Sequence, residues 1–187
     1  MQRKSRSLTA VLLTTIALIA LVGTVVALGA SSGADIAAET IKYNYKEKVT
    51  TFWGTEAEPV SVQVGKYTIW APYLEYYQET GIVIASGGVR LEGKDPTVRL
   101  TCDRLEAGQE RIVATGNVSF DYTDFSGRAG VLTYTQVNKR VVLEKDPVVE
   151  TEGGRIDGKV IEIDLEGQTL TASGGSKMHL EEVESSE

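Results

Sequence analysis

The sequence of 187 residues has one cysteine, Cys102, one histidine, His179, and four prolines. A single cysteine excludes an internal disulfide, and Cys102 lies too far along the chain to be a lipid-modified cysteine at the start of an exported protein. With one histidine, no set of nucleophile, base and orienting group can be assigned in the sequence, and no cluster of metal-binding residues is present in it. We therefore expect no enzymatic activity, no metal and no cofactor, and a fold that depends on packing alone.

Charge is also absent from residues 8–30. An uncharged run of this length can cross the roughly 30 Å hydrocarbon core as a helix, whereas the apolar stretch of a cleavable signal is usually about 7 to 15 residues long. Three basic residues lie within residues 1–7, and the positive-inside rule keeps them in the cytoplasm. We expect a single-pass inner-membrane anchor with the following domain in the periplasm. The alternative is cleavage at Ala27-Leu-Gly29, which would release a soluble periplasmic protein.

Basic residues are scarce in the part that is exported. It has 16 basic and 26 acidic residues, a net charge of −10. This average charge repels nucleic acid, so we exclude nucleic acid as a main partner. Residues 31–40 are mostly small and polar, which predicts a linker, and residues 181–187 are acidic with little to bury, which predicts a disordered tail.

Four segments between these ends share a pattern in which a small residue is followed three and five positions later by larger apolar ones or by alanine. They are Ala71-Pro-Tyr-Leu-Glu-Tyr76, Cys102-Asp-Arg-Leu-Glu-Ala107, Ala129-Gly-Val-Leu-Thr-Tyr134 and Gly158-Lys-Val-Ile-Glu-Ile163. Three of them lead into a second signature: Ala85-Ser-Gly-Gly-Val-Arg-Leu91, Ala114-Thr-Gly-Asn-Val-Ser-Phe120 and Ala172-Ser-Gly-Gly-Ser-Lys-Met178. Spacings of 27 to 31 residues are typical of repeat architectures. The sequence predicts stacked strand-turn-strand units, with a weaker edge unit that begins at Ala38.

Apolar and polar residues alternate throughout residues 41–180. Ile161 and Ile163, for example, alternate with Glu162 and Asp164. Period-two patterning with few prolines predicts half-buried antiparallel strands, here of about five to eight residues, and no helix after the anchor. The fold class is therefore all-β, and residues 41–180 form one domain.

Successive side chains of a strand point to opposite faces, so the two signatures predict which residues face the interior. The predicted inward set is Leu74, Tyr76, Ala85, Leu105, Ala114, Leu132, Tyr134, Ile161, Ile163 and Ala172. Large and small residues share this face. They can pack against each other as an ordinary β-sandwich core. Alternatively, rows of small residues can widen the interior into an apolar groove that admits a lipid chain.

The units of the form small-x-x-Leu-x-Tyr, followed by a turn, an apolar strand and Ala-Ser/Thr-Gly-Gly/Asn-Val, resemble the OstA-like β-jelly-roll family of lipopolysaccharide transport, which includes LptA and LptC. The clearest instance is the segment 114–120 followed by 129–134, and the resemblance covers residues 67–180. The third unit departs from the pattern, with Glu144-Lys-Asp-Pro147 in place of the glycine signature.

This resemblance implies an open antiparallel β-jelly roll of stacked units whose interior shelters the acyl chains of lipopolysaccharide or a related lipid. It also implies docking to a soluble OstA-like jelly-roll protein and work with an inner-membrane ABC transporter complex. The N-terminal anchor resembles LptC more than LptA. A structural β-repeat scaffold of the cell envelope, without lipid cargo, is the alternative function, and the two differ in whether the interior is open.

An open stack of strands also leaves unpaired backbone groups at its ends, which a partner strand can cover. We expect the partner edge to be the last predicted strand, Lys177, Met178, His179 and Leu180. Because alternation places His179 between two apolar residues, it is predicted to face outward.

Overall fold

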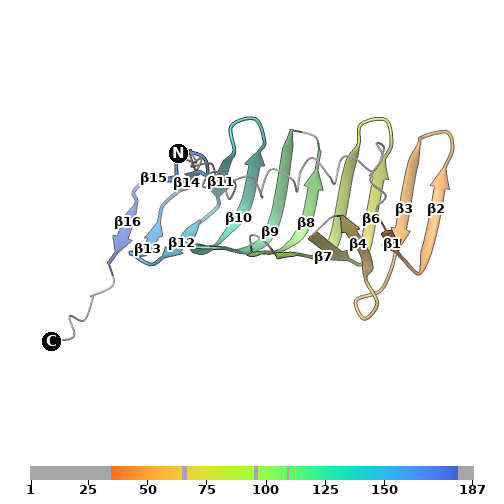
Figure 1. Ribbon diagram of the computed structural model, residues 1–187, viewed down its shortest axis with the longest axis horizontal. Coiled ribbons are helices and arrows are strands. Elements are labelled where there is room, and N and C mark those ends of the chain that lie inside the picture. Colours follow the sequence, from red (N-terminus) through yellow and green to blue (C-terminus); the bar gives the residue numbers. More distant parts are fainter. Residues whose placement is uncertain (1–34, 65–66, 95–96, 109, 181–187) are drawn as a thin grey trace, which may run out of the picture.

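The computed structural model describes residues 35–64, 67–94, 97–108 and 110–180. In these ranges the chain forms sixteen strands joined by antiparallel pairing, and they stack side by side along the long axis of the molecule (Figure 1). The strands are β1 (Asp35–Ala37), β2 (Thr40–Asn44), β3 (Val49–Trp53), β4 (Val60–Val64), β5 (Tyr67–Ala71), β6 (Tyr73–Tyr77), β7 (Ile82–Lys94), β8 (Thr97–Ala107), β9 (Arg111–Tyr122), β10 (Phe125–Thr135), β11 (Arg140–Glu144), β12 (Val148–Thr151), β13 (Gly154–Asp157), β14 (Val160–Asp164), β15 (Thr169–Ser173) and β16 (Lys177–His179).

The all-β prediction is confirmed. Within the described ranges we find no helix capable of spanning a membrane. The predicted cytoplasmic segment 1–7, the predicted anchor 8–30 and the predicted tail 181–187 lie outside those ranges.

The predicted strand length is wrong for the four central strands. β7, β8, β9 and β10 contain 13, 11, 12 and 11 residues. The register of their pairing shifts near the middle, for example between Ser86 and Val89 in β7 and between Thr101 and Arg104 in β8. A shift of this kind is a β-bulge, which bends a strand. The sequence pattern predicted strands of about five to eight residues and no bend, whereas each of these strands runs through a bulge into a second half.

Because these strands bend, the halves belong to two facing sheets. Sheet I consists, in order, of β2, β3, β6, the first half of β7, the second half of β8, the first half of β9, the second half of β10, β11, β14 and β15. Sheet II consists of β1, β4, β5, the other halves of β7 to β10, β12, β13 and β16. The bends and the short links between sheets lie along one side, the corner side. The turns within each sheet lie along the other, the hairpin side.

Two consecutive residues with positive φ mark four of the corners. The pairs are Gly87 (90°) and Gly88 (95°), Gly116 (75°) and Asn117 (45°), Lys145 (61°) and Asp146 (58°), and Gly174 (83°) and Gly175 (84°). Glycine adopts this left-handed region at little cost, and asparagine and aspartate tolerate it. The Gly-Gly/Asn signature thus encodes the corner. The third unit makes the same corner with Lys145 and Asp146, so its departure in sequence is not a departure in backbone shape.

The start of the domain differs from the prediction. β1 lies inside the linker predicted over residues 31–40 and pairs with β4, Ile36 being opposite Val62. Ile36 is half-buried and packs against the core. Ile36 is the single large apolar residue of this segment and shows no periodicity, so the sequence pattern did not predict this strand. The weak edge unit is present as β2, the outermost strand of sheet I.

Candidate functional site

The inward side chains of sheet I form two rows that cross all of its strands. The corner row, nearer the bends, is Ile41, Phe52, Leu74, Ala85, Leu105, Ala114, Leu132, Leu143, Ile161 and Ala172. The hairpin row is Tyr43, Thr50, Tyr76, Val83, Ala107, Ile112, Tyr134, Val141, Ile163 and Leu170. All ten residues of the predicted inward set lie in these two rows. Their contact with a lipid stays a prediction.

Sheet II faces them with a row of its own. Its members are Ile36, Val62, Ile69, Leu91, Leu100, Phe120, Gly127, Val149, Ile156 and Met178. Sequence reasoning did not assign this row to the interior wall. The signal was present, because the last position of the second signature, occupied by Leu91, Phe120 and Met178, falls in this row in all three copies.

The corner side of the interior is solid. Ala85, Ala114, Leu143 and Ile161 are all 0% exposed. The lipid interpretation expected small residues to widen a groove, whereas Ala85 and Ala114 are fully buried in the core. On this side the sandwich-core interpretation describes the structure.

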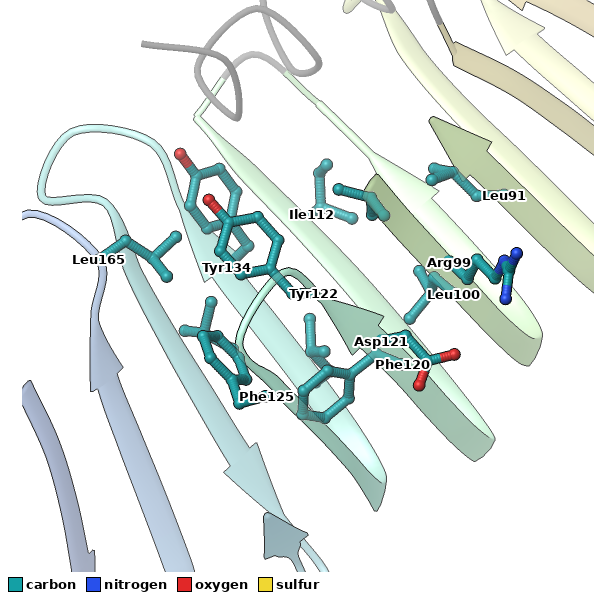
Figure 2. A pocket seen from close by; sticks show the side chains of 13 residues that line it. Leu91, Arg99, Leu100, Ile112, Phe120, Asp121, Tyr122, Phe125, Tyr134 and Leu165 are labelled. Carbon is teal, nitrogen blue, oxygen red and sulfur yellow. The ribbon is translucent and has the colours of Figure 1, made fainter. Parts of the chain in front are cut away.

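The hairpin side contains a cavity of about 100 Å³ between the sheets. Apolar and aromatic side chains from β7 to β11 and the turn after β14 form its walls (Figure 2). Sheet II contributes Leu91, Val98, Leu100, Phe120, Tyr122 and Phe125, and sheet I and the turn contribute Ile112, Leu132, Tyr134, Val141 and Leu165. Of the predicted set, Leu132 and Tyr134 line this cavity. Arg99 and Asp121 belong to its margin and their side chains point away from it (Figure 2).

Three aromatic rings stiffen the sheet II wall of this cavity. The ring of Phe125 lies 6.1 Å from that of Phe120 and 5.2 Å from that of Tyr122, measured between centroids. Such edge-to-face and tilted contacts stabilise beyond the area that they bury. The sequence pattern did not predict this cluster, because the three rings meet across the β9–β10 turn.

The cavity is too small for a whole acyl chain in this conformation. An engineered apolar cavity of about 150 Å³ binds benzene, which is much smaller than an acyl chain. A chain of a dozen carbons therefore requires the sheets to move apart. Backbone pairing among the described strands joins the two sheets through the bent strands, and on the hairpin side only side chains hold them together.

Tyr134 places a buried polar group beside this apolar space. The residue is 5% exposed, and within the described part of the chain its hydroxyl has no hydrogen-bond partner. Burial raises the pKa of Tyr134 above its ordinary value, and the neighbouring Tyr122 adds to this rise. Burial likewise raises the pKa of Tyr122, with Asp124 contributing. Both phenols are therefore neutral at physiological pH, and Figure 2 shows them extending toward the same end of the cavity.

The inner rows are uncovered at both ends of the stack. Ile41 on β2 is 57% exposed, and Met178 on β16 is 54% exposed. Of the four residues predicted as a partner edge, Lys177, Met178 and His179 form β16, which pairs with β13 and with no other described strand. His179 lies in the outward register, next to the inward Met178, and Leu180 follows the strand and is 73% exposed.

The remaining reactive groups are inert or scattered. Burial raises the pKa of the Cys102 thiol to about 11, so it is not ionised and not nucleophilic at neutral pH. Among the residues that the structure describes, no group of three or more His, Cys, Asp or Glu side chains is placed to hold a metal ion.

Stacked antiparallel units, bent into two sheets around an apolar interior, define the chain as a repeat-built β-jelly roll. The sequence profile of the family described as LptA/(LptD N-terminal domain) LPS transport protein matches residues 35–169. The chain belongs to this family, and the resemblance to the OstA-like proteins is thereby confirmed.

Two further comparisons accompany the family match. A solved structure is similar to this chain: LptH from Pseudomonas aeruginosa, described as the LptA homologous periplasmic component of the conserved lipopolysaccharide transport device. The identity is 17% over 80% of this chain and 95% of that chain, with a TM-score of 0.36. No curated protein sequence matches this chain.

Proposed function

We propose that this chain is a non-enzymatic lipid-binding component of a lipopolysaccharide export bridge. In this proposal the β domain lies in the periplasm, shelters acyl chains between its two sheets and hands them to a partner jelly roll. Family membership supports the transport role. The observation that carries the lipid-binding role is the apolar cavity between the sheets on the side where, among the described residues, no backbone pairing joins them.

Energetics favour a shelter of this kind. Each buried methylene contributes roughly 0.8 kcal/mol, so a chain of a dozen carbons gains on the order of 10 kcal/mol on leaving water. Separating the hairpin sides exposes the side chains that now touch across the cavity. An inserted acyl chain covers the same surfaces again, which offsets the cost of opening.

The two uncovered ends allow the apolar interior to continue into a neighbouring jelly roll. Ile41 and Met178 continue the inner rows to the outermost strands, so another jelly roll stacked on β2 or β16 would extend the apolar interior without a break. The edge of β16 that pairs with no described strand offers backbone groups for that contact. We propose a soluble OstA-like protein as the partner at this edge.

The proposal includes the remaining parts of the bridge. Residues 8–30 hold the chain in the inner membrane as an LptC-like anchor. Lipid extraction from the membrane requires energy, which we assign to an inner-membrane ABC transporter complex.

The scaffold alternative has one observation in its favour, the solid packing on the corner side. Native mass spectrometry of the chain purified from envelopes distinguishes the two functions. The lipid carrier retains lipopolysaccharide or a precursor, and a scaffold retains nothing.

A matched pair of variants makes this measurement specific for the cavity. Val141 lines the cavity and its neighbour Val142 faces outward on the same strand. Val141→Trp fills the cavity and should abolish lipid retention, whereas Val142→Trp should leave it unchanged. Equal retention by both variants, or none by the wild-type chain, would contradict the proposal.

A further inference from the structure

The hydroxyl of Tyr134 has no structural task that the described residues reveal. Its oxygen is buried, lacks a partner, and belongs to a residue that lines an otherwise apolar cavity. A buried polar group without a hydrogen bond destabilises a protein, and native structures rarely keep one without a reason. Phenylalanine in its place would avoid this cost and keep the ring in the wall.

We infer that Tyr134 is a specificity-determining residue that hydrogen-bonds a hydroxyl group carried on the acyl chain of the bound lipid. This inference rests on the proposed lipid-binding function. A tyrosine hydroxyl both donates and accepts, as does the hydroxyl of a hydroxylated acyl chain, so the two groups can satisfy each other. A plain hydrocarbon chain would leave the phenol unpaired.

The surroundings of the phenol support this assignment. The adjacent wall residues Ile112, Leu132 and Val141 offer no acceptor from their side chains, and the phenol of Tyr122 is the other polar side chain that reaches the same end of the cavity (Figure 2). The neutral state of both phenols matches a neutral ligand group. Opening of the hairpin side to admit a chain would bring the Tyr134 hydroxyl against that chain.

Competition binding tests the inference on the full chain. A photoreactive tetradecanoic acid is crosslinked to the protein, and only crosslinks to peptides within residues 97–143 are counted, so that binding to the apolar N-terminal segment is ignored. Tetradecanoic acid and 3-hydroxytetradecanoic acid then compete. We expect the hydroxylated acid to compete about three- to tenfold better with the wild-type chain, the effect of one net hydrogen bond.

The variant Tyr134→Phe should lose this preference and still bind both acids, while Tyr77→Phe, on the outer face of β6, should keep it. Because the lost hydroxyl was unsatisfied, Tyr134→Phe should also melt about 2 to 4 °C higher than the wild type without lipid. A lower melting temperature would show that the hydroxyl has a structural partner and would overturn the inference. Equal competition by the two acids in the wild type would also overturn it while leaving lipid binding intact. Absence of any crosslink in residues 97–143 would instead contradict the proposed function, and the inference with it.

Discussion

The corners of the jelly roll should respond to mutation according to backbone conformation rather than burial. Gly88 has a φ of 95°, and a methyl group added to it would meet no atom within 4 Å. Gly88→Ala therefore isolates the backbone term, which is about 1 to 2 kcal/mol for an L-residue in the left-handed region. Restriction of the unfolded chain by alanine returns about 0.4 to 1 kcal/mol. We expect a net loss of about 1 kcal/mol in the free energy of unfolding.

Gly116→Ala adds a steric term to the same backbone term. The new methyl group would overlap the carboxylate of Asp103, which accepts hydrogen bonds of 3.2 and 3.0 Å from the Asn117 amide nitrogen. The carboxylate must move and these bonds weaken, which costs about 1 kcal/mol more. Lys145→Gly works in the opposite direction, because Lys145 adopts a φ of 61° and glycine removes that strain. We expect it to stabilise the chain by about 0.5 to 1 kcal/mol.

Thermal unfolding of the full chain, followed by circular dichroism, measures all three variants. At about 2 to 4 °C for each kcal/mol, Gly88→Ala should melt about 3 °C lower, Gly116→Ala about 6 °C lower and Lys145→Gly about 2 °C higher than the wild type. These expectations rest on the assignment of the paired left-handed residues as the cause of the bend between the two sheets. Destabilisation by Lys145→Gly, or no effect of Gly88→Ala, would refute that assignment.

Two further perturbations test the β16 edge and the β14–β15 hairpin. Proline at Met178 or at His179 removes one backbone donor from β16. Because alternate N–H groups of a strand point to opposite edges, one of the two variants should weaken binding of a jelly-roll partner while circular dichroism shows the fold intact. Unchanged binding in both variants would count against a partner at this edge. At the β14–β15 hairpin, the backbone N–H groups of Gly167 and Glu166 donate to Asp164 Oδ1 at 2.8 and 3.0 Å, and they lower the pKa of its carboxyl group below the ordinary 3.8. The stabilisation by the ionised carboxylate is thus present above pH 3.8 and is lost as the pH falls through the lowered pKa. Asp164→Ala should therefore melt below the wild type at pH 7, and the difference in melting temperature should shrink in acid. A difference that is independent of pH would refute the role of the charge.

The period-two pattern predicted the inner face of sheet I because that face depends on local geometry. Tyr134 and Ile163 are each 5% exposed, as the alternation with Thr133 and Glu162 implied. The same local logic failed at the bends. Residues 85–91 fit one regularly alternating strand in the sequence, whereas the register of pairing shifts between Ser86 and Val89 and the strand bends there.

The cavity could not be predicted from the sequence, because its walls come from different sheets. Whether Phe125 faces Leu132 across a gap depends on how the corners set the angle between the sheets, and that angle is a property of the whole stack. The small residues were a misleading signal for the same reason. Ala85 and Ala114 lie on the corner side, where the sheets are closest and the interior is filled.

Site-specific photo-crosslinking in cells with active lipopolysaccharide transport tests the central claim most directly. A photoreactive amino acid is placed at Leu132, which lines the cavity, or at its neighbour Thr133, which faces outward on β10. Because adjacent side chains of a strand point to opposite faces, the probe at position 132 should capture lipopolysaccharide and the probe at position 133 should not. Equal capture at both positions, or capture at neither while transport continues, would contradict an interior that carries the acyl chains.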